Sequence, residues 1–130
     1  MKRLLDADVL IGALDRSDAH HDRARRLLTG WHRRRDAVSI SVFNLSEALI
    51  APAADAARLA TAREAIAALG VEVRLPNEAI GIEAARLRQR YPISLPDAYC
   101  LATAKHTRST LASFDQKVLK AATDQGLDTA

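Results

Sequence analysis

Four acidic residues of this 130-residue chain stand almost alone in neutral, apolar stretches: Asp6, Glu47, Asp97 and Asp115. Glu47 is the only charged residue between positions 37 and 54, and Asp97 is the only one between positions 91 and 104. A carboxylate that folding removes from water is costly unless a partner compensates its charge. Because no Lys or Arg lies in the same stretches, a shared divalent cation is the simplest partner for all four.

The elements that must position these acids alternate between strand and helix. Short apolar stretches predict strands at 2–6, 37–41, 71–75 and 110–112, with a frayed last strand at 126–127. Apolar periodicity, caps and breakers predict helices at 9–14, 18–35, 42–50, 55–69, 77–91, 96–106 and 116–122. Strands separated by helices need crossover connections, so the sheet should be mostly parallel with helices on both faces. The sequence therefore predicts one α/β domain over residues 1–130.

This arrangement predicts that the acids meet at one edge of the sheet. Asp6 ends the first strand, Glu47 lies in the helix after the second, Asp115 follows the fourth, and Asp97 begins the helix before it. Ligand sites of open parallel sheets form outside the carboxyl ends of the strands. Two carboxylates ~4 Å apart repel by ~4 kcal/mol at an effective dielectric of ~20. A cation would offset that repulsion, and oxygen ligands without Cys or clustered His select Mg²⁺ or Mn²⁺ over zinc.

Each acid also has a purely structural interpretation. Asp6 and Asp115 could cap the helices that follow them, and Ser94-Leu95-Pro96-Asp97 fits a capping box. Glu47 lies on an apolar helix stripe and caps nothing, so its structural alternative is a salt bridge to a distant Arg. These alternatives do not explain why the four acids should converge on one edge.

Charge and composition favour a nucleic-acid partner and a reducing compartment. The net charge is +3 with a sequence pI near 9.4, and internal acids would leave the surface more basic than this total. His20 and His21 could contact metal or RNA or be solvated. The arginines around Trp31 could grip phosphates, or lie on a solvated helix face with Trp31 in the core. The lone Cys100 and the lack of any ~20-residue apolar span favour a cytoplasmic protein with a buried thiol.

Four segments, in order along nearly the whole chain, carry a resemblance to a known family: Leu4–Leu10 (LLDADVL), Leu45–Ala48 (LSEA), Leu95–Ala98 (LPDA) with Ala102–Ala104 (ATA), and Leu111–Asp115 (LASFD). Together they resemble the PIN-domain ribonucleases, and in particular the small VapC-type toxins of bacterial toxin–antitoxin pairs. Two positions depart from the family pattern. Asp8 replaces a neutral polar residue and so adds a charge near the metal, and Ser113 replaces a Thr.

The resemblance implies a three-layer α/β/α sandwich around a four- to five-stranded, mostly parallel sheet. It implies endonucleolytic cleavage of RNA, with Asp6 and Asp97 as the main Mg²⁺ ligands and with Glu47 and Asp115 holding metal, bound water or the surrounding shell. It also implies a homodimer that a small antitoxin protein silences. The sequence offers apolar faces for such a dimer on two helices, carrying Leu59, Ile66 and Leu69, and Ile80, Leu87 and Tyr91.

Two other functions fit parts of the pattern. Asp6-Ala7-Asp8-Val9 resembles the aspartate pair of haloacid-dehalogenase-type phosphatases, in which the first Asp is the nucleophile, but that function leaves Glu47 unexplained. The second alternative is a basic α/β module that binds nucleic acid without cutting it. Metal-dependent cleavage of RNA would separate a nuclease from both.

Overall fold

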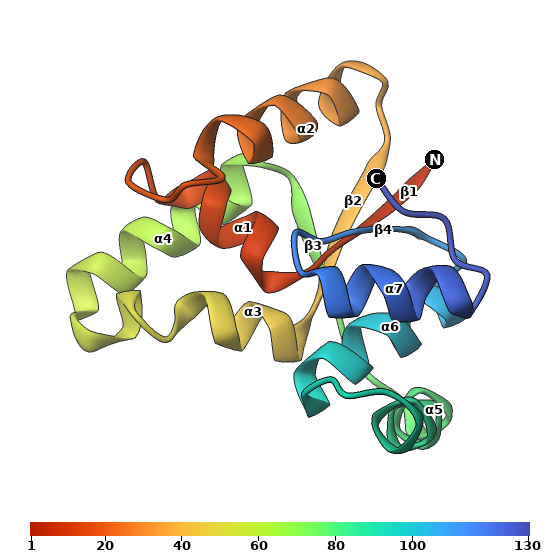
Figure 1. Ribbon diagram of the computed structural model, residues 1–130. Helices are drawn as coiled ribbons and strands as arrows, with labels where there is room; N and C mark the ends of the chain where they lie inside the picture. The colour runs from red at the N-terminus through yellow and green to blue at the C-terminus, as the bar shows by residue number, and fades with distance from the viewer.

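A computed structural model describes all residues, 1–130, and places four parallel strands in one sheet (Figure 1). The strand order is β3-β2-β1-β4, with strands β1 (Lys2–Leu5), β2 (Ala37–Ser41), β3 (Val71–Arg74) and β4 (Thr110–Ala112). All four predicted strands are confirmed, to within one residue at their ends. The predicted last strand is reduced to one parallel bridge between Leu111 and Thr129, beyond positions 126–127.

The predicted helices are confirmed, with ends that shift by at most three residues. They are α1 (Ala7–Leu14), α2 (His21–Arg33), α3 (Val42–Leu49), α4 (Ala56–Ala68), α5 (Glu78–Arg90), α6 (Leu95–Thr107) and α7 (Gln116–Asp124), with a 3₁₀ turn η1 (Pro52–Ala54) before α4. The largest shift is at the start of α2. There the Asp18 side chain accepts a hydrogen bond from the backbone N–H of His20, which holds these residues in a turn. None of the helices is both long and apolar enough to cross a membrane.

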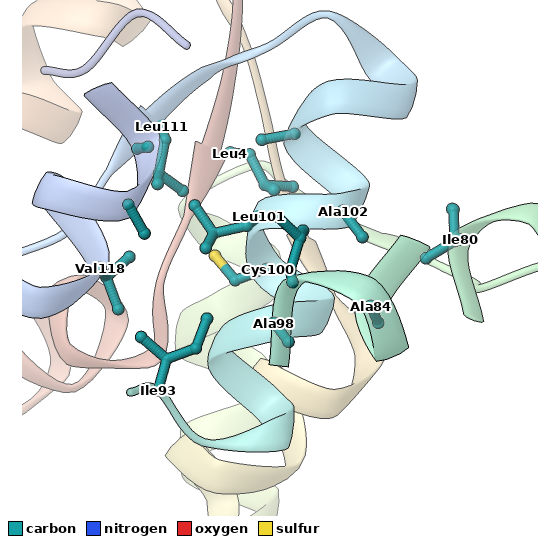
Figure 2. Close-up of a cluster of buried hydrophobic side chains, with 14 residues drawn as sticks. Leu4, Ile80, Ala84, Ile93, Ala98, Cys100, Leu101, Ala102, Leu111 and Val118 are labelled. Atoms are coloured by element: carbon teal, nitrogen blue, oxygen red, sulfur yellow. The ribbon is translucent and has the colours of Figure 1, made fainter. Parts of the chain in front are cut away.

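The sheet is covered on both faces, which makes the three-layer α/β/α sandwich that was predicted. Neighbouring residues of a strand point to opposite faces, and Leu4 and Leu5 accordingly enter different cores. Leu4 packs with apolar side chains of α5, α6 and α7 (Figure 2), whereas Leu5 packs with those of α1, α2, α3 and α4. Cys100 is a free, fully buried thiol in the first core, as expected.

The prediction of spare apolar faces on α4 and α5 is wrong for their central residues. Ile66, Ile80 and Leu87 are only 6%, 3% and 2% exposed, because α4 packs against β3 and α1 and α5 packs against α6. The large hydrophobic side chains that the single chain leaves exposed are instead Met1, Ile50, Val73, Leu75, Ile82 and Leu95. Helical periodicity finds an apolar face but cannot tell whether the chain's own sheet covers it.

The strand order creates one position suited to a ligand. The chain runs outward from β1 to β2 and β3, and then returns to add β4 on the other side of β1. The carboxyl ends of β1 and β4 therefore flank a topological switch point, where sites of open α/β sheets form. Asp6 directly follows β1, and Ser113 directly follows β4.

Candidate acidic site at the switch point

Asp6 is the most buried of the predicted site residues, at 4% exposure. Its Oδ1 accepts a hydrogen bond from the backbone N–H of Ala7 at 2.8 Å, so Asp6 does cap α1. Its Oδ2 accepts a second hydrogen bond from the Ser113 hydroxyl at 2.7 Å, across the switch point. The capping alternative is therefore real, but it uses only one of the two carboxylate oxygens.

Asp8 joins the same site from the first turn of α1. Its Oδ2 accepts a hydrogen bond from the backbone N–H of Phe114 at 3.0 Å, whereas its Oδ1 is buried without a hydrogen-bond partner. Together with the bond from Ser113 to Asp6, this contact ties the loop after β4 to the start of α1. The sequence indicated a charge at Asp8, but it did not indicate these two contacts.

Asp97 and Asp115 also lie at helix starts. Asp97 forms the predicted capping box of α6, in which Ser94 and Asp97 each accept a hydrogen bond from the other's backbone N–H, at 3.2 and 3.1 Å. Asp115 caps α7 by accepting from the backbone N–H of Lys117 at 2.8 Å. Both side chains are half-buried, so each keeps one surface open to solvent. Capping and membership of an acidic site are therefore compatible.

Glu47 is half-buried on α3 and caps nothing. Its Oε1 accepts a hydrogen bond from the Asn44 side-chain amide at 3.0 Å. None of the ion pairs in the structure includes Glu47, so the proposed salt bridge to a distant Arg is not formed. Asn44 was not singled out from the sequence, because an Asn in a helix does not by itself indicate which side chain it will contact.

Burial and mutual repulsion raise the pKa of several of these carboxyl groups. The pKa of Asp6 rises from an ordinary 3.8 to about 7, chiefly through burial and then through the charge of Asp8. Asp97 adds to this rise, whereas the hydrogen bond from Ser113 opposes it. Asp6 thus lies at the centre of the acidic site.

The same two causes connect the remaining acids. The pKa of Asp8 is raised by burial and by the charge of Asp115, and the pKa of Glu47 is raised by burial and by the charge of Asp97. Burial, and then the charges of Asp6 and Asp97, raises the pKa of the Cys100 thiol well above its ordinary value. The five acids therefore act on one another as a single group at the carboxyl edge of the sheet.

The donor chemistry of this group suits a hard divalent cation. It offers only carboxylate and hydroxyl oxygens, no ion pair of the structure includes any of the five acids, and one Asp8 oxygen is buried without a partner. No three His, Cys, Asp or Glu side chains stand close enough together to form a complete ligand set. Mg²⁺ does not need one, because it usually keeps several waters and binds through one or two carboxylates.

A stacked group of side chains borders the acids. The His20 ring stacks on the Phe114 ring with centroids 4.5 Å apart, and the Arg23 guanidinium lies 5.0 Å from the same ring. His20 is therefore packed against the loop after β4 as well as being exposed. Trp31 is buried in the core, as one of the two interpretations predicted. The arginines on and just after α2 are exposed: Arg23, Arg25, Arg26, Arg33, Arg34 and Arg35.

Comparison with known proteins gives a family match and several similar structures. A profile of the PIN domain family matches residues 3–124. A toxin–antitoxin complex from Klebsiella pneumoniae contains a chain that is 25% identical, with a TM-score of 0.71 over 90% of this chain and 89% of that one. No curated protein gave a match.

Two further solved structures share the fold at lower identity. VapC20 from Mycobacterium tuberculosis, a toxin that cleaves the sarcin–ricin loop, is 18% identical, with a TM-score of 0.75 over 92% of this chain and 94% of that one. VapBC2 from Rickettsia felis, bound to a DNA fragment from its promoter, contains a chain that is 14% identical, with a TM-score of 0.78 over 100% of this chain and 98% of that one.

Proposed function

The chain belongs to the PIN domain family, and we propose that it is a Mg²⁺- or Mn²⁺-dependent endoribonuclease, the toxin of a toxin–antitoxin pair. The observation that carries this proposal is the acidic group at the switch point. Five carboxyl groups, of which Asp6 is nearly fully buried, share one edge of the sheet, and none of them forms an ion pair with a Lys, Arg or His side chain. Such an arrangement is unfavourable in isolation and is explained by a divalent cation.

The proposed roles follow from the position of each acid. Asp6 and Asp97 would be the main metal ligands, and Glu47 and Asp115 would hold the metal or its bound water. When bound, the cation supplies Lewis-acid activation of the scissile phosphate and of water, and it offsets charge on the leaving oxygen. The Ser113 hydroxyl holds the Asp6 carboxylate in place. The raised pKa of Glu47 favours it as a proton acceptor.

The surface beside the acids supports RNA as the substrate. His20, Phe114 and Arg23 form a stack at the rim of the site, and single-stranded nucleic acids bind to aromatic and guanidinium groups of this kind. The exposed arginines of α2 continue from Arg23 along the helix and would contact phosphates without reading the base sequence.

Purified protein should cleave single-stranded RNA in the presence of Mg²⁺ or Mn²⁺, and EDTA should abolish the cleavage. Gel analysis of an end-labelled oligoribonucleotide would show whether internal bonds are cut. Cleavage that persists in EDTA would contradict the metal site. Binding of the RNA without cleavage, at any metal concentration, would support the non-catalytic module instead. The phosphatase alternative is set aside, because the family match covers nearly the whole chain.

A groove next to the acids supports a protein inhibitor. It has a volume of about 570 Å³, lies between α1, α3 and α4, and is lined by Glu47 and by apolar side chains that include Ile11, Leu14 and Ala62. A segment of an antitoxin could place apolar side chains here. An antitoxin Arg that reached the acids could compete with the metal by bidentate pairing to a carboxylate. The complex from Klebsiella pneumoniae is itself a toxin–antitoxin complex.

If this chain is the toxin of such a pair, co-expression with its cognate small antitoxin should yield a complex that does not cleave RNA. Failure of the two proteins to co-purify would refute the partner.

Light scattering should give the free toxin twice its chain mass of 14.1 kDa, as expected for the homodimer. Val73, Leu75, Ile82 and Leu95 are among the exposed apolar residues that could contribute to such an interface. A mass near 14.1 kDa would refute the dimer.

Added Mg²⁺ should raise the melting temperature of the protein, because a ligand that binds only the folded state stabilises it. At a free Mg²⁺ concentration of about 100 times its dissociation constant, the folded state would be stabilised by about 2.7 kcal/mol. Glu47→Gln should reduce this increment, since it removes one of the charges that attract the cation. Differential scanning calorimetry with and without millimolar Mg²⁺ measures the effect. A melting temperature that does not respond to Mg²⁺ would count against the acidic group as a cation site.

A further inference from the structure

Asn44 is fully buried on α3 and forms one hydrogen bond within α3 and one to α6. Its Nδ2 donates to Glu47 Oε1 at 3.0 Å and to the backbone carbonyl of Pro96 at 3.3 Å. The Pro96 carbonyl and an ionised Glu47 carboxylate can only accept hydrogen bonds. The Asn44 amide must therefore turn its NH2 group toward them, because the opposite orientation would place Oδ1 next to two other acceptors.

These two hydrogen bonds connect two of the acids of the site. Glu47 lies one helical turn after Asn44 on the same face of α3, which brings the two side chains together. Pro96 belongs to the first turn of α6 and directly precedes Asp97. The Asn44 amide therefore sets where the Glu47 carboxylate stands relative to the helix end that carries Asp97.

The rest of the Asn44 side chain argues against a role in stability alone. Its Oδ1 is buried and accepts no hydrogen bond, and a buried acceptor without a donor is unfavourable. An apolar residue would avoid this loss. Glu47, in contrast, has no ion pair and is repelled by Asp97, so without the amide its carboxylate would be free to turn toward solvent.

We infer that Asn44 is a positioning residue, which holds the Glu47 carboxylate toward Asp97 and thereby sets the affinity of the acidic site for a divalent cation. The inference rests on the proposed function, because it concerns the same metal site. It adds a residue that touches neither metal nor substrate and that acts through Glu47. Partners of this kind, which orient a metal ligand, typically contribute about 10- to 100-fold to metal affinity or activity.

Titration calorimetry with Mn²⁺ alone tests the inference. Asn44→Leu and Asn44→Ala should each weaken Mn²⁺ binding about 10- to 100-fold, and they should lower RNA cleavage at subsaturating Mn²⁺. Melting in EDTA measures the effect of each substitution on stability separately from metal binding, because both remove the unpaired acceptor and also the donor to Glu47 and Pro96. Asn44→Ala covers the case in which leucine is too large.

A second variant on α3 separates positioning from general destabilisation. Ser41→Ala removes the cap of the same helix, where Ser41 Oγ accepts from the backbone N–H of Phe43 at 3.2 Å. It should lower the melting temperature and leave Mn²⁺ affinity unchanged. In a Glu47→Gln background, Asn44→Leu should weaken Mn²⁺ binding no further, because the residue through which it acts is already changed.

Three results would overturn the inference. The first is Mn²⁺ affinity within about twofold of the parent in both Asn44 variants, well short of the expected 10-fold or greater loss. The second is a loss of Mn²⁺ affinity on Asn44→Leu that is as large in the Glu47→Gln background as in the parent. The third comes from NMR of the metal-free protein, in which Glu47→Ala should shift the Asn44 side-chain amide protons; no shift would mean that the contact is not formed.

The NMR measurement also separates this inference from the proposed function. If the parent binds no Mn²⁺ and the amide protons do shift on Glu47→Ala, then the proposed metal site is refuted while the Asn44–Glu47 contact stands. If the parent binds Mn²⁺ and cleaves RNA and the amide protons do not shift, then the function stands and the inference about Asn44 is refuted.

Discussion

Asp97→Asn should abolish RNA cleavage while leaving the fold intact. Asp97 contributes to the raised pKa of both Asp6 and Glu47, so it is the acid that connects these two. The substitution removes a negative charge and a metal ligand and keeps the size of the side chain. We expect a loss of at least about 100-fold in cleavage rate, because even residues that only orient a ligand contribute about 10- to 100-fold.

Asp97→Asn should change the acidic site without disturbing the capping of α6. An Asn side-chain oxygen can still accept the hydrogen bond from Ser94 N–H that closes the capping box, so α6 should form normally. Asp55→Asn is the matched control. Asp55 also makes a capping hydrogen bond at a helix start, as the N-cap of α4 that accepts from Ala57 N–H at 2.8 Å, and it is exposed outside the acidic group. If Asp97→Asn cleaves RNA as well as Asp55→Asn does, the assignment of the site is wrong.

The sequence was sufficient to predict the elements and the edge at which the acids gather. Glu47 stands alone in an apolar stretch, and predicted strands alternate with predicted helices. Both are local signals of the sequence, and the structure agrees with both. The capping alternatives for Asp6, Asp97 and Asp115 also proved correct as descriptions of local structure. Because each cap leaves part of its carboxylate available, local structure alone could not decide between the two roles.

The contacts that hold the site together could not be predicted. Ser113 and Asp6 are 107 residues apart, and Asn44 and Pro96 are 52 apart, so both pairings depend on how β1, β4, α3 and α6 pack. The same limit explains the error about apolar faces. The periodicity of Ile80 and Leu87 is the same whether α5 faces another helix of the chain or another protein, and only the tertiary structure shows that it packs against α6.

The second large effect is expected in the stability of the metal-free protein as pH rises. The pKa of Asp6 is 3.8 ordinarily and about 7 in the folded protein. Between these values the folded state holds a proton that the unfolded state has lost. Asp6 therefore contributes a decrease in the free energy of unfolding as pH rises from about 4 to about 7, on the order of 4 kcal/mol.

Asp6→Asn should remove this dependence, because an amide stays neutral. Its oxygen can still accept from the backbone N–H of Ala7, and its Nδ2 can donate to the Ser113 hydroxyl oxygen in place of the bond that Asp6 accepts from it. Urea unfolding in EDTA should find the variant more stable than the parent near pH 8, by a few kcal/mol, and about equally stable near pH 4. Taking the difference from the parent cancels the titration of other groups, such as Asp8 and Glu47, to first order. At pH 8, Mg²⁺ should stabilise the parent and not the variant. A difference between the two proteins that stays constant across this pH range would mean that Asp6 is not held near a pKa of 7 by its buried position among the acids.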